Sequence, residues 1–224
     1  MKQWNGRKSM VCLLVLFITL LAAVTIAGQL YRTEALVTDF SRKKYAALLF
    51  SSFGTDWMGR DMFARTMTGL SMSIRIGLLT AVVSTVIAFF LGLFAASMGR
   101  VADGFVVGLI DLVMGIPHIL LLVLISFALG KGFKGVVVGI SLTHWTSLAR
   151  LIRGEVLQLK ESQYIKISRK LGRGGFETAL KHMTPHLIPQ LLVGLVLLFP
   201  HAILHEPASR FWASGFPQSS LPSA

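Results

Sequence analysis

The sequence predicts an all-α protein, a polytopic bundle of transmembrane helices, and three observations support this prediction. Of the 224 residues, 54% are hydrophobic and only 14% are charged, whereas soluble domains carry about 25% charged residues. The mean hydropathy is +0.68. Apolar stretches long enough for a bilayer alternate with short basic or glycine-containing segments. The composition therefore excludes an ordinary soluble domain.

Five stretches are expected to cross the membrane. Residues 10–31 form the first, and we expect an uncleaved anchor because this apolar run exceeds the roughly 7–15 residues of a signal-peptide core. A polar segment, residues 32–73, follows it. The remaining predicted spans are residues 74–98, 105–129 with Pro117 inside it, 136–148 and 187–203, and tight turns are expected at 99–104 and 131–134.

The distribution of charge predicts the orientation of these spans. Lys2, Arg7 and Lys8 precede the first span without any acid, and cytoplasmic segments are the ones enriched in Lys and Arg. The amino terminus is therefore expected in the cytoplasm, on the same side as the basic segment between the fourth and fifth spans. These flanking clusters explain the net charge of +12. Because no nucleic-acid-binding signature accompanies the charge, we expect no nucleic-acid partner.

The basic segment, residues 155–189, is amphipathic. Its apolar residues recur at roughly helical spacing, with a Leu-Gly break at Gly172 and a proline at Pro185 that is expected to end the second short helix. A polar amphipathic insert between spans suits the docking of a soluble partner. The apolar positions are Val156, Leu159, Tyr164, Ile167 and Leu171.

Three blocks of sequence resemble the inner-membrane permease subunits of ABC importers for dipeptides, oligopeptides and nickel. FGTDWMGRDMFAR, residues 53–65, resembles the Leu-Gly-Thr-Asp-x-x-Gly-Arg-Asp block before the second span of those permeases. HWTSLARLIRGEVLQLKESQY, residues 144–164, resembles their Trp…Ala-Arg-x-x-Arg-x-x-x-Leu run. Residues 164–185 resemble the loop that such permeases insert into a cleft of the ATPase. The resemblance extends from about the first span to Glu206.

The resemblance implies the fold and the partners of the chain. It implies a multi-pass type I ABC importer permease of the inner membrane, embedded in lipid and paired with a second permease subunit. Two cytoplasmic ATPase subunits would bind ATP and Mg, and an extracytoplasmic binding protein would deliver the substrate. This chain contains no G-x-x-x-x-G-K-[ST] phosphate loop. We therefore expect it to bind no cofactor, to have no catalytic residues and to be no enzyme.

Two groups of site residues follow from the resemblance. Lys166, Ile167 and Ser168 stand where the family loop has Glu-Ala-Ala, which reverses one charge and adds bulk to the helix that would enter the ATPase cleft. The expected ATPase-coupling residues are Tyr164, Lys166, Ile167, Ser168, Arg169, Gly172 and Pro185. The expected outer family block is Gly54, Thr55, Asp56, Gly59, Arg60 and Asp61, either as a charged network or as a solvated surface.

Asp111, Pro117 and His118 are the candidates for the transport pathway. Burying a carboxylate inside a membrane span costs free energy. Asp111 is therefore expected to face the pathway or the partner permease. Alternatively, it lies near the cytoplasmic boundary, where Arg100 or water would stabilise it. Pro117 predicts a kink, and for His118 packing is the favoured interpretation.

No metal site is expected from the sequence. His182 and His186 have the i, i+4 spacing of ligands on a helix, but no carboxylate or thiol accompanies them and Pro185 intervenes. The other four histidines lie in or beside predicted spans, where they would meet a passing ion: His118, His144, His201 and His205.

The chain divides into residues 1–73, a permease core of residues 74–206 with its coupling loop at 150–186, and a tail of residues 207–224. Reading permitted codons for the tail from the third base gives Ser-Ile-Thr-Phe-Leu-Gly, which continues the family pattern. We therefore expect a frameshifted tail, with about five of six spans retained. If that frameshift is a real lesion, the product is expected not to restore uptake to a permease-deficient strain. An inactive permease remnant and, less favoured, a proton-coupled carrier with Asp111 as its relay are the alternatives.

Overall fold

A computed structural model describes residues 6–43, 53–130 and 132–214. The chain forms two compact units, Met1–Arg75 and Ile76–Ala224. Within the described residues the regular structure is helical, apart from one antiparallel β-bridge between Thr55 and Asp61. The predicted all-α fold is therefore confirmed.

The first unit contains helix α1 (Gly6–Leu30), two short 3₁₀ turns (Glu34–Leu36 and Phe40–Arg42) and the beginning of α2 (Met62–Ser97). Helix α1 approaches α2 at Gly28, where an added Cβ would collide with the Met67 carbonyl oxygen and the Ser71 Cβ. Two hydroxyls of α2 join the helices, because Thr68 Oγ1 donates to the Gly28 carbonyl at 3.3 Å and Ser71 Oγ to that of Thr25 at 3.1 Å. The glycine thus permits backbone-to-backbone packing of the two helices.

The outer family block is a folded loop organised around Asp56. Its Oδ1 accepts hydrogen bonds from the backbone N–H groups of Met58, at 2.8 Å, and Arg60, at 3.0 Å. Its Oδ2 accepts from Arg60 Nε at 2.9 Å and forms an ion pair with Arg65. The Asp56 side chain is only 11% exposed. Asp56 and Arg60 therefore belong to a charged network, as one of the two interpretations expected, but its third member is Arg65.

The end of the same loop starts α2. Asp61 Oδ1 accepts from the Phe63 N–H at 2.7 Å, and a carboxylate in this position satisfies a backbone donor that the first helical turn leaves unpaired. Gly59 has a φ of 76°, and a Cβ there would overlap the Asp39 carbonyl. Helix α2 begins at Met62, 12 residues before the predicted second span.

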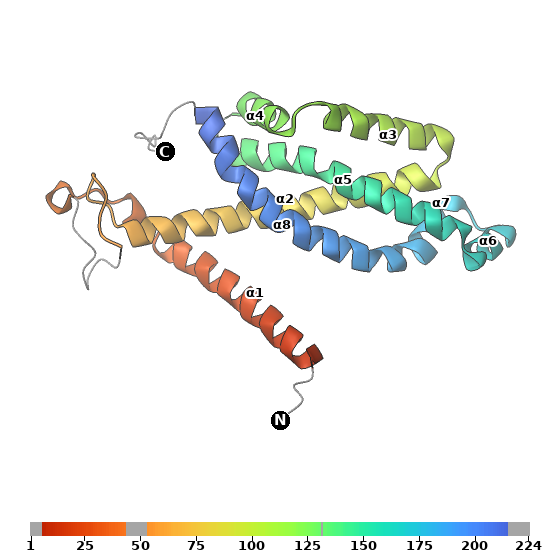
Figure 1. The fold of residues 1–224 in the computed structure, drawn as a ribbon, viewed down its shortest axis with the longest axis horizontal. Coiled ribbons are helices and arrows are strands. Elements are labelled where there is room, and N and C mark those ends of the chain that lie inside the picture. The colour runs from red at the N-terminus through yellow and green to blue at the C-terminus, as the bar shows by residue number, and fades with distance from the viewer. Residues whose placement is uncertain (1–5, 44–52, 131, 215–224) are drawn as a thin grey trace. The chain divides into compact units, whose positions relative to one another are not determined.

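The second unit holds the rest of α2 and the remaining helices. Helices α6 and α7 lie at one end of this unit, whereas α4 and the last turns of α8 lie at the other (Figure 1). The elements are α3 (Arg100–Gly115), α4 (His118–Ala128), α5 (Phe133–Glu161), α6 (Gln163–Lys170), α7 (Gly175–Thr178), the π-helical turn η3 (Ala179–Met183) and α8 (Thr184–Ser214).

Helix α5 forms the centre of this unit. Ile140, Ala149, Ile152 and Val156 of α5 are completely buried. Glycines at its contacts with α2 and α4, Gly92 and Gly139, allow these helices to approach α5 closely. A Cβ at Gly92 of α2 would lie 2.8 Å from the Ala149 carbonyl oxygen and 3.0 Å from the Ile152 Cβ. The core is thus built on contacts that leave no room for an extra methyl group.

The contact between α5 and α4 is equally close. A Cβ at Gly139 of α5 would lie 3.0 Å from Ser126 Oγ and 3.2 Å from the Leu122 carbonyl oxygen. Ser126 Oγ also donates to the Gly135 carbonyl at 3.2 Å. Helix α4, although only 11 residues long, is therefore fixed along the first half of α5.

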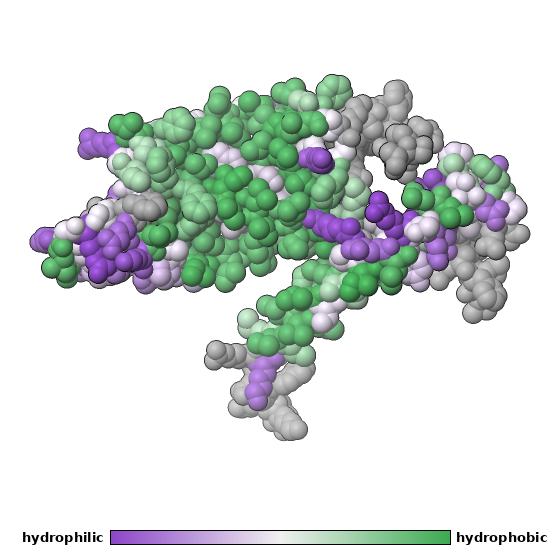
Figure 2. Space-filling view, turned by 180° about the vertical axis from the view of Figure 1, so that it is seen from behind, coloured by the Kyte–Doolittle hydropathy of each residue, from purple (hydrophilic) through white to green (hydrophobic). Residues whose placement is uncertain are grey.

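Four helices are long and apolar enough to cross a membrane, and α3 with α4 make a fifth candidate if the bent pair is one span. These two helices meet at 93°, with Ile116 extended and Pro117 preceding α4. The predicted kink at Pro117 is confirmed. Figure 2 shows hydrophobic residues over most of the visible face of the helices, with hydrophilic residues gathered at the α6–α7 end of the second unit. The predicted helical bundle with membrane spans is confirmed.

Several predicted boundaries are wrong. The 99–104 turn is shorter than predicted, because α3 begins at Arg100. Helix α5 extends beyond residue 148 to Glu161, so the first part of the 150–186 loop is helical and continuous with the fourth predicted span. Helix α8, Thr184–Ser214, extends beyond the predicted fifth span of residues 187–203 at both ends.

We predict opposite effects for the same substitution at two helical glycines. Gly92→Ala should destabilise the protein by about 1–3 kcal/mol, since the added methyl group meets the α5 backbone and overpacking has this cost. Gly108→Ala, at a site with open space around it, should stabilise α3 by about 0.5–1 kcal/mol. Thermal unfolding of both variants in the same detergent checks this. Shifts in the same direction would contradict the packing argument.

We also predict an acid-sensitive outer loop. Burial alone would raise the pKa of Asp56, but hydrogen bonds from the backbone and side chain of Arg60 and the backbone of Met58 lower it below the usual 3.8. A carboxylate with a lowered folded-state pKa stabilises the fold fully above the unfolded-state value, and this contribution is lost as the pH falls through the lowered pKa.

Asp56→Asn should therefore reduce hydrogen-exchange protection of the Met58 and Arg60 amides at neutral pH. It should have little effect below the lowered pKa, where wild-type Asp56 is also neutral. The measurement is the ratio of protection factors of the two proteins at each pH. A ratio that stays the same from neutral to strongly acidic pH would contradict the assignment.

Candidate functional site

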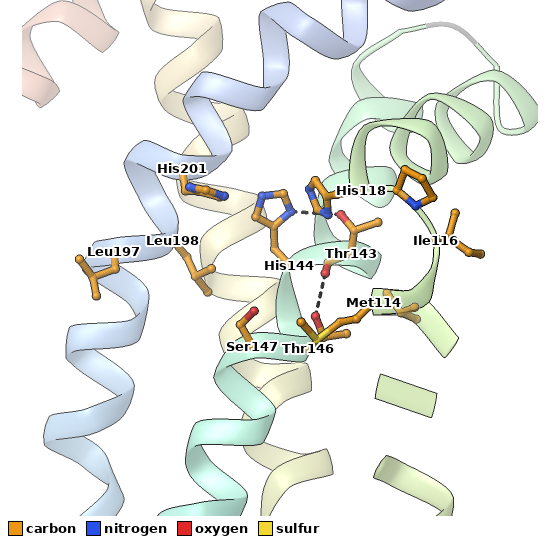
Figure 3. Close-up of a pocket in the computed structure, with 12 residues that line it drawn as sticks. Met114, Ile116, His118, Thr143, His144, Thr146, Ser147, Leu197, Leu198 and His201 are labelled. Carbon is orange, nitrogen blue, oxygen red and sulfur yellow. Dashed lines mark hydrogen bonds between the residues drawn. The ribbon is translucent and has the colours of Figure 1, made fainter. Parts of the chain in front are cut away.

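A cavity of about 470 Å³ opens beside the break between α3 and α4. Ligand sites commonly have volumes of about 300–1,000 Å³. Side chains from α3, α4, α5 and α8 surround it, and in Figure 3 the imidazoles of His118, His144 and His201 lie along one edge. The lining residues are Val113, Met114, Ile116, Pro117, His118, Thr143, His144, Thr146, Ser147, Leu197, Leu198 and His201.

Four histidines from three helices meet at this edge. His118 is the first residue of α4, His144 lies in the middle of α5, and His201 and His205 are one turn apart on α8. The ring centroid of His144 lies 4.5 Å from that of His118 and 5.1 Å from that of His205. The Nε2 atoms of His201 and His205 are 3.2 Å apart. The sequence placed these four residues in or beside spans but did not bring them together.

The orientation of His144 is fixed from within α5. Its Nδ1 lies 3.0 Å from the Ile140 carbonyl oxygen and 3.1 Å from Thr143 Oγ1. The carbonyl accepts only, so Nδ1 carries the proton and Nε2 keeps its lone pair. His144 is 6% exposed, and its Nε2 is buried without a hydrogen-bond partner among the described residues, as is the Nε2 of His118.

The structure separates the three predicted pathway residues. Pro117 and His118 line the cavity, whereas Asp111 is not among its lining residues. Asp111 instead accepts a hydrogen bond from Arg150 Nη2 of α5 at 2.8 Å, and both side chains are more than half exposed. Arg150 of α5 thus stands where one of the alternatives for Asp111 had placed Arg100 or water.

A second ion pair joins the same two helices. Arg153 binds both carboxylate oxygens of Asp103, with Nη2 2.7 Å from Oδ2, and Lys160 donates to the Ala96 carbonyl near the end of α2. Neither ion pair was expected from the sequence, in which these basic residues indicated a cytoplasmic segment and a family-like run. The ion pairs could have been predicted from spacing: Asp103 and Asp111 lie two turns apart on one face of α3, and the basic residues of α5 recur at helical intervals.

Helix α6 of the predicted coupling loop has an inward and an outward side. Ile165 is fully buried and Ser168 is 9% exposed, whereas Tyr164, Ile167 and Leu171 are 42%, 55% and 78% exposed. The last three recur at positions i, i+3 and i+7 and share one face of the helical turn. We call Tyr164, Ile167 and Leu171 the apolar stripe. Lys166 pairs with Glu161 at 2.8 Å, and Arg169 lies within α6.

The predicted break after α6 is confirmed. Gly172 has a φ of 85°, a conformation that glycine adopts without steric cost, and α7 begins three residues later. Arg173 lies 2.9 Å from His182 Nε2, whereas the His186 ring packs against Tyr164 with centroids 5.7 Å apart. The i, i+4 histidine pair therefore contacts two different side chains and does not form a joint site.

Pro185 does not end a helix, as the sequence analysis predicted, but lies in the first turn of α8. The chain remains helical through the preceding π-helical turn, in which Thr184 Oγ1 donates to the Ala179 carbonyl at 3.2 Å. Proline is tolerated in a first helical turn, and the wider π turn before it gives the ring space. The chain thus changes direction at Ser162, which is extended between α5 and α6, and again at Gly172, but not at Pro185.

Comparison with known proteins assigns this architecture to a family. The sequence model of the family described as "Binding-protein-dependent transport system inner membrane component" matches residues 88–217. This match includes α3 to α8, the cavity and the coupling loop. It also passes Glu206, after which the sequence analysis expected a frameshift, and that expectation stays a prediction.

Curated relatives agree with this match. A putative peptide permease protein of Brucella abortus biovar 1 (strain 9-941) is 37% identical over 165 residues, which are 74% of this chain and 55% of the relative. The oligopeptide transport system permease protein OppC of Bacillus subtilis (strain 168) is 30% identical over 213 residues, 95% of this chain and 70% of the relative. The dipeptide transport system permease protein DppC of the same strain is 31% identical over 163 residues, which are 73% of this chain and 51% of the relative.

The chain spans about half the length of several of the curated relatives it matches. The family model nevertheless covers more than half of the chain, including the whole region that carries the cavity and the loop. The chain belongs to the family of inner membrane components of binding-protein-dependent transport systems.

Proposed function

We propose that the chain is a permease subunit of an ATP-driven importer that moves peptides across the inner membrane. The names of the relatives support a peptide as the substrate, because they describe peptide, oligopeptide and dipeptide permeases. Nickel, the other substrate that the sequence resemblance allowed, has no such support among these relatives. A family defined by dependence on a binding protein favours this importer over a proton-coupled carrier.

The remaining components of the importer are part of the proposal. A second permease subunit would complete the pathway, two cytoplasmic ATPase subunits would bind ATP and Mg, and an extracytoplasmic protein would deliver the peptide. The exposed apolar sides of α1, α2 and α8 support contact with lipid and with a second permease. Arg150, Arg153 and Lys160 support a cytoplasmic position for the α6 end, and Lys2, Arg7 and Lys8 support the same side for the amino terminus.

The apolar stripe is the observation that carries the coupling part of the proposal. Large apolar side chains on a short, otherwise polar helix are unfavourable in water and suit a protein groove. The buried Ile165 holds α6 against the bundle, so that a push on the stripe is transmitted to the packed helices. Movement of the loop with the closing ATPases would then shift the bundle as a rigid body and expose the cavity to one side of the membrane or the other.

Uptake of a labelled dipeptide or oligopeptide by a strain lacking its own permease tests this function. The full chain, produced with the other importer subunits, should restore uptake. Ile167→Asp should reduce uptake about tenfold or more, since coupling energies of about 1–3 kcal/mol correspond to factors of about 5–150.

Val101→Asp is the matched control, because Val101 is an aliphatic side chain that is 89% exposed outside the loop, and uptake should stay near the wild-type level. Failure of the unmodified chain to restore any uptake would contradict the proposal and favour an inactive permease remnant. Equal losses in the two variants would contradict the role of the apolar stripe.

A further inference from the structure

We infer that the histidines at the edge of the cavity bind a divalent transition-metal ion, with one imidazole nitrogen each from His118, His144 and His205 as ligands. Each residue offers a ligand atom, and these atoms all lie within 4.8 Å of one another. They come from α4, α5 and α8, so a bound ion would join three helices of the second unit. The sequence analysis expected no metal ligands in this chain.

The state of His144 is the strongest evidence for this site. Its Nδ1 is engaged by the Ile140 carbonyl, which fixes the proton there, and its buried Nε2 has no hydrogen-bond partner among the described residues. Metal-bound histidines have this arrangement, in which the second ring nitrogen donates to a backbone carbonyl or a carboxylate. A buried acceptor without a partner is unfavourable, and a metal ion would satisfy it.

His118 repeats part of the pattern on the neighbouring helix. Its Nε2 is also buried and without a hydrogen-bond partner in the described part of the chain, and its ring lies 4.5 Å from that of His144 and 4.9 Å from that of His205. Two buried, unpartnered imidazole nitrogens beside a third imidazole are poorly explained by hydrophobic packing alone. They form a preorganised set of nitrogen donors.

The geometry requires only a small adjustment. Tetrahedral bonds of about 2.0–2.1 Å place ligand atoms about 3.4 Å apart, so nitrogens that lie up to 4.8 Å apart need to approach by at most about 1.4 Å. Three protein ligands leave a fourth position open. His201 contacts His205 and lines the cavity. Imidazole donors favour Zn²⁺, Ni²⁺ or Co²⁺, whereas Mg²⁺ and Ca²⁺ prefer oxygen.

Metal titration of the purified full chain tests the inference. The chain carries an affinity tag without histidine, is stripped with a chelator, and is titrated with Zn²⁺ by calorimetry in detergent. We expect one Zn²⁺ per chain, no response to Mg²⁺ or Ca²⁺, and a higher unfolding temperature with Zn²⁺. Binding of Co²⁺ should give the visible absorption bands of a tetrahedral nitrogen site.

Variants separate the cluster from other histidines. His118→Gln and His205→Gln lie at partly exposed positions, so both are expected to fold, and each should weaken Zn²⁺ binding at least tenfold, the lower bound for loss of even an indirect contact. His144→Gln should do the same if it folds. A double variant, His182→Gln with His186→Gln, serves as the control and should bind Zn²⁺ like the wild type.

Three results would overturn the inference. They are the absence of saturable Zn²⁺ binding, unchanged affinity in His118→Gln and His205→Gln, and loss of binding in the control variant. None of these readouts uses transport. Failure of the metal site is therefore distinguishable from failure of the proposed peptide import.

Discussion

The close packing of α5 is the constraint on which the rest of the second unit depends. Backbone meets backbone at Gly92 and at Gly139, so α2 and α4 contact α5 without intervening side chains. The ion pair between Arg153 and Asp103 holds α3 on another side. Because dispersion contacts weaken quickly with small gaps, these approaches fix the mutual positions of four helices. Both candidate functional regions are built on this arrangement.

Helix α5 also connects the two regions physically. His144 lies beside the cavity, and Glu161 ends the helix immediately before α6. These residues are about 25 Å apart at the rise of 1.5 Å per residue of an α-helix. An uninterrupted helix of this length moves as one rigid element, whereas the break at Pro117 and the glycine at Gly172 allow changes in direction. Force applied to the apolar stripe would thus reach the edge of the cavity. A metal ion joining α4, α5 and α8 would stiffen that edge.

Much of the fold was predictable, because a bilayer demands long apolar runs and these are visible in the sequence. The boundaries were less so. Hydropathy falls at Arg150, yet α5 continues because Asp111 and Asp103 of α3 pair with its arginines. Helical spacing identified Tyr164, Ile167 and Leu171 as one face but not as the exposed one, which depends on the burial of Ile165. The histidine cluster was hidden for a similar reason. His118 and His205 are far apart in sequence and meet only through the packing of α4 and α8.

The most direct measurement of the central claim is site-specific cross-linking of the loop to the ATPase subunits. In a Cys12→Ser background, which removes the single native cysteine, Leu171→Cys and Val101→Cys each place one thiol at a highly exposed position. With the ATPases present, a thiol-reactive cross-linker should join residue 171 to an ATPase and leave residue 101 largely unlinked. No cross-link from residue 171, or equal yields from both positions, would contradict the assignment of the apolar stripe as the coupling surface.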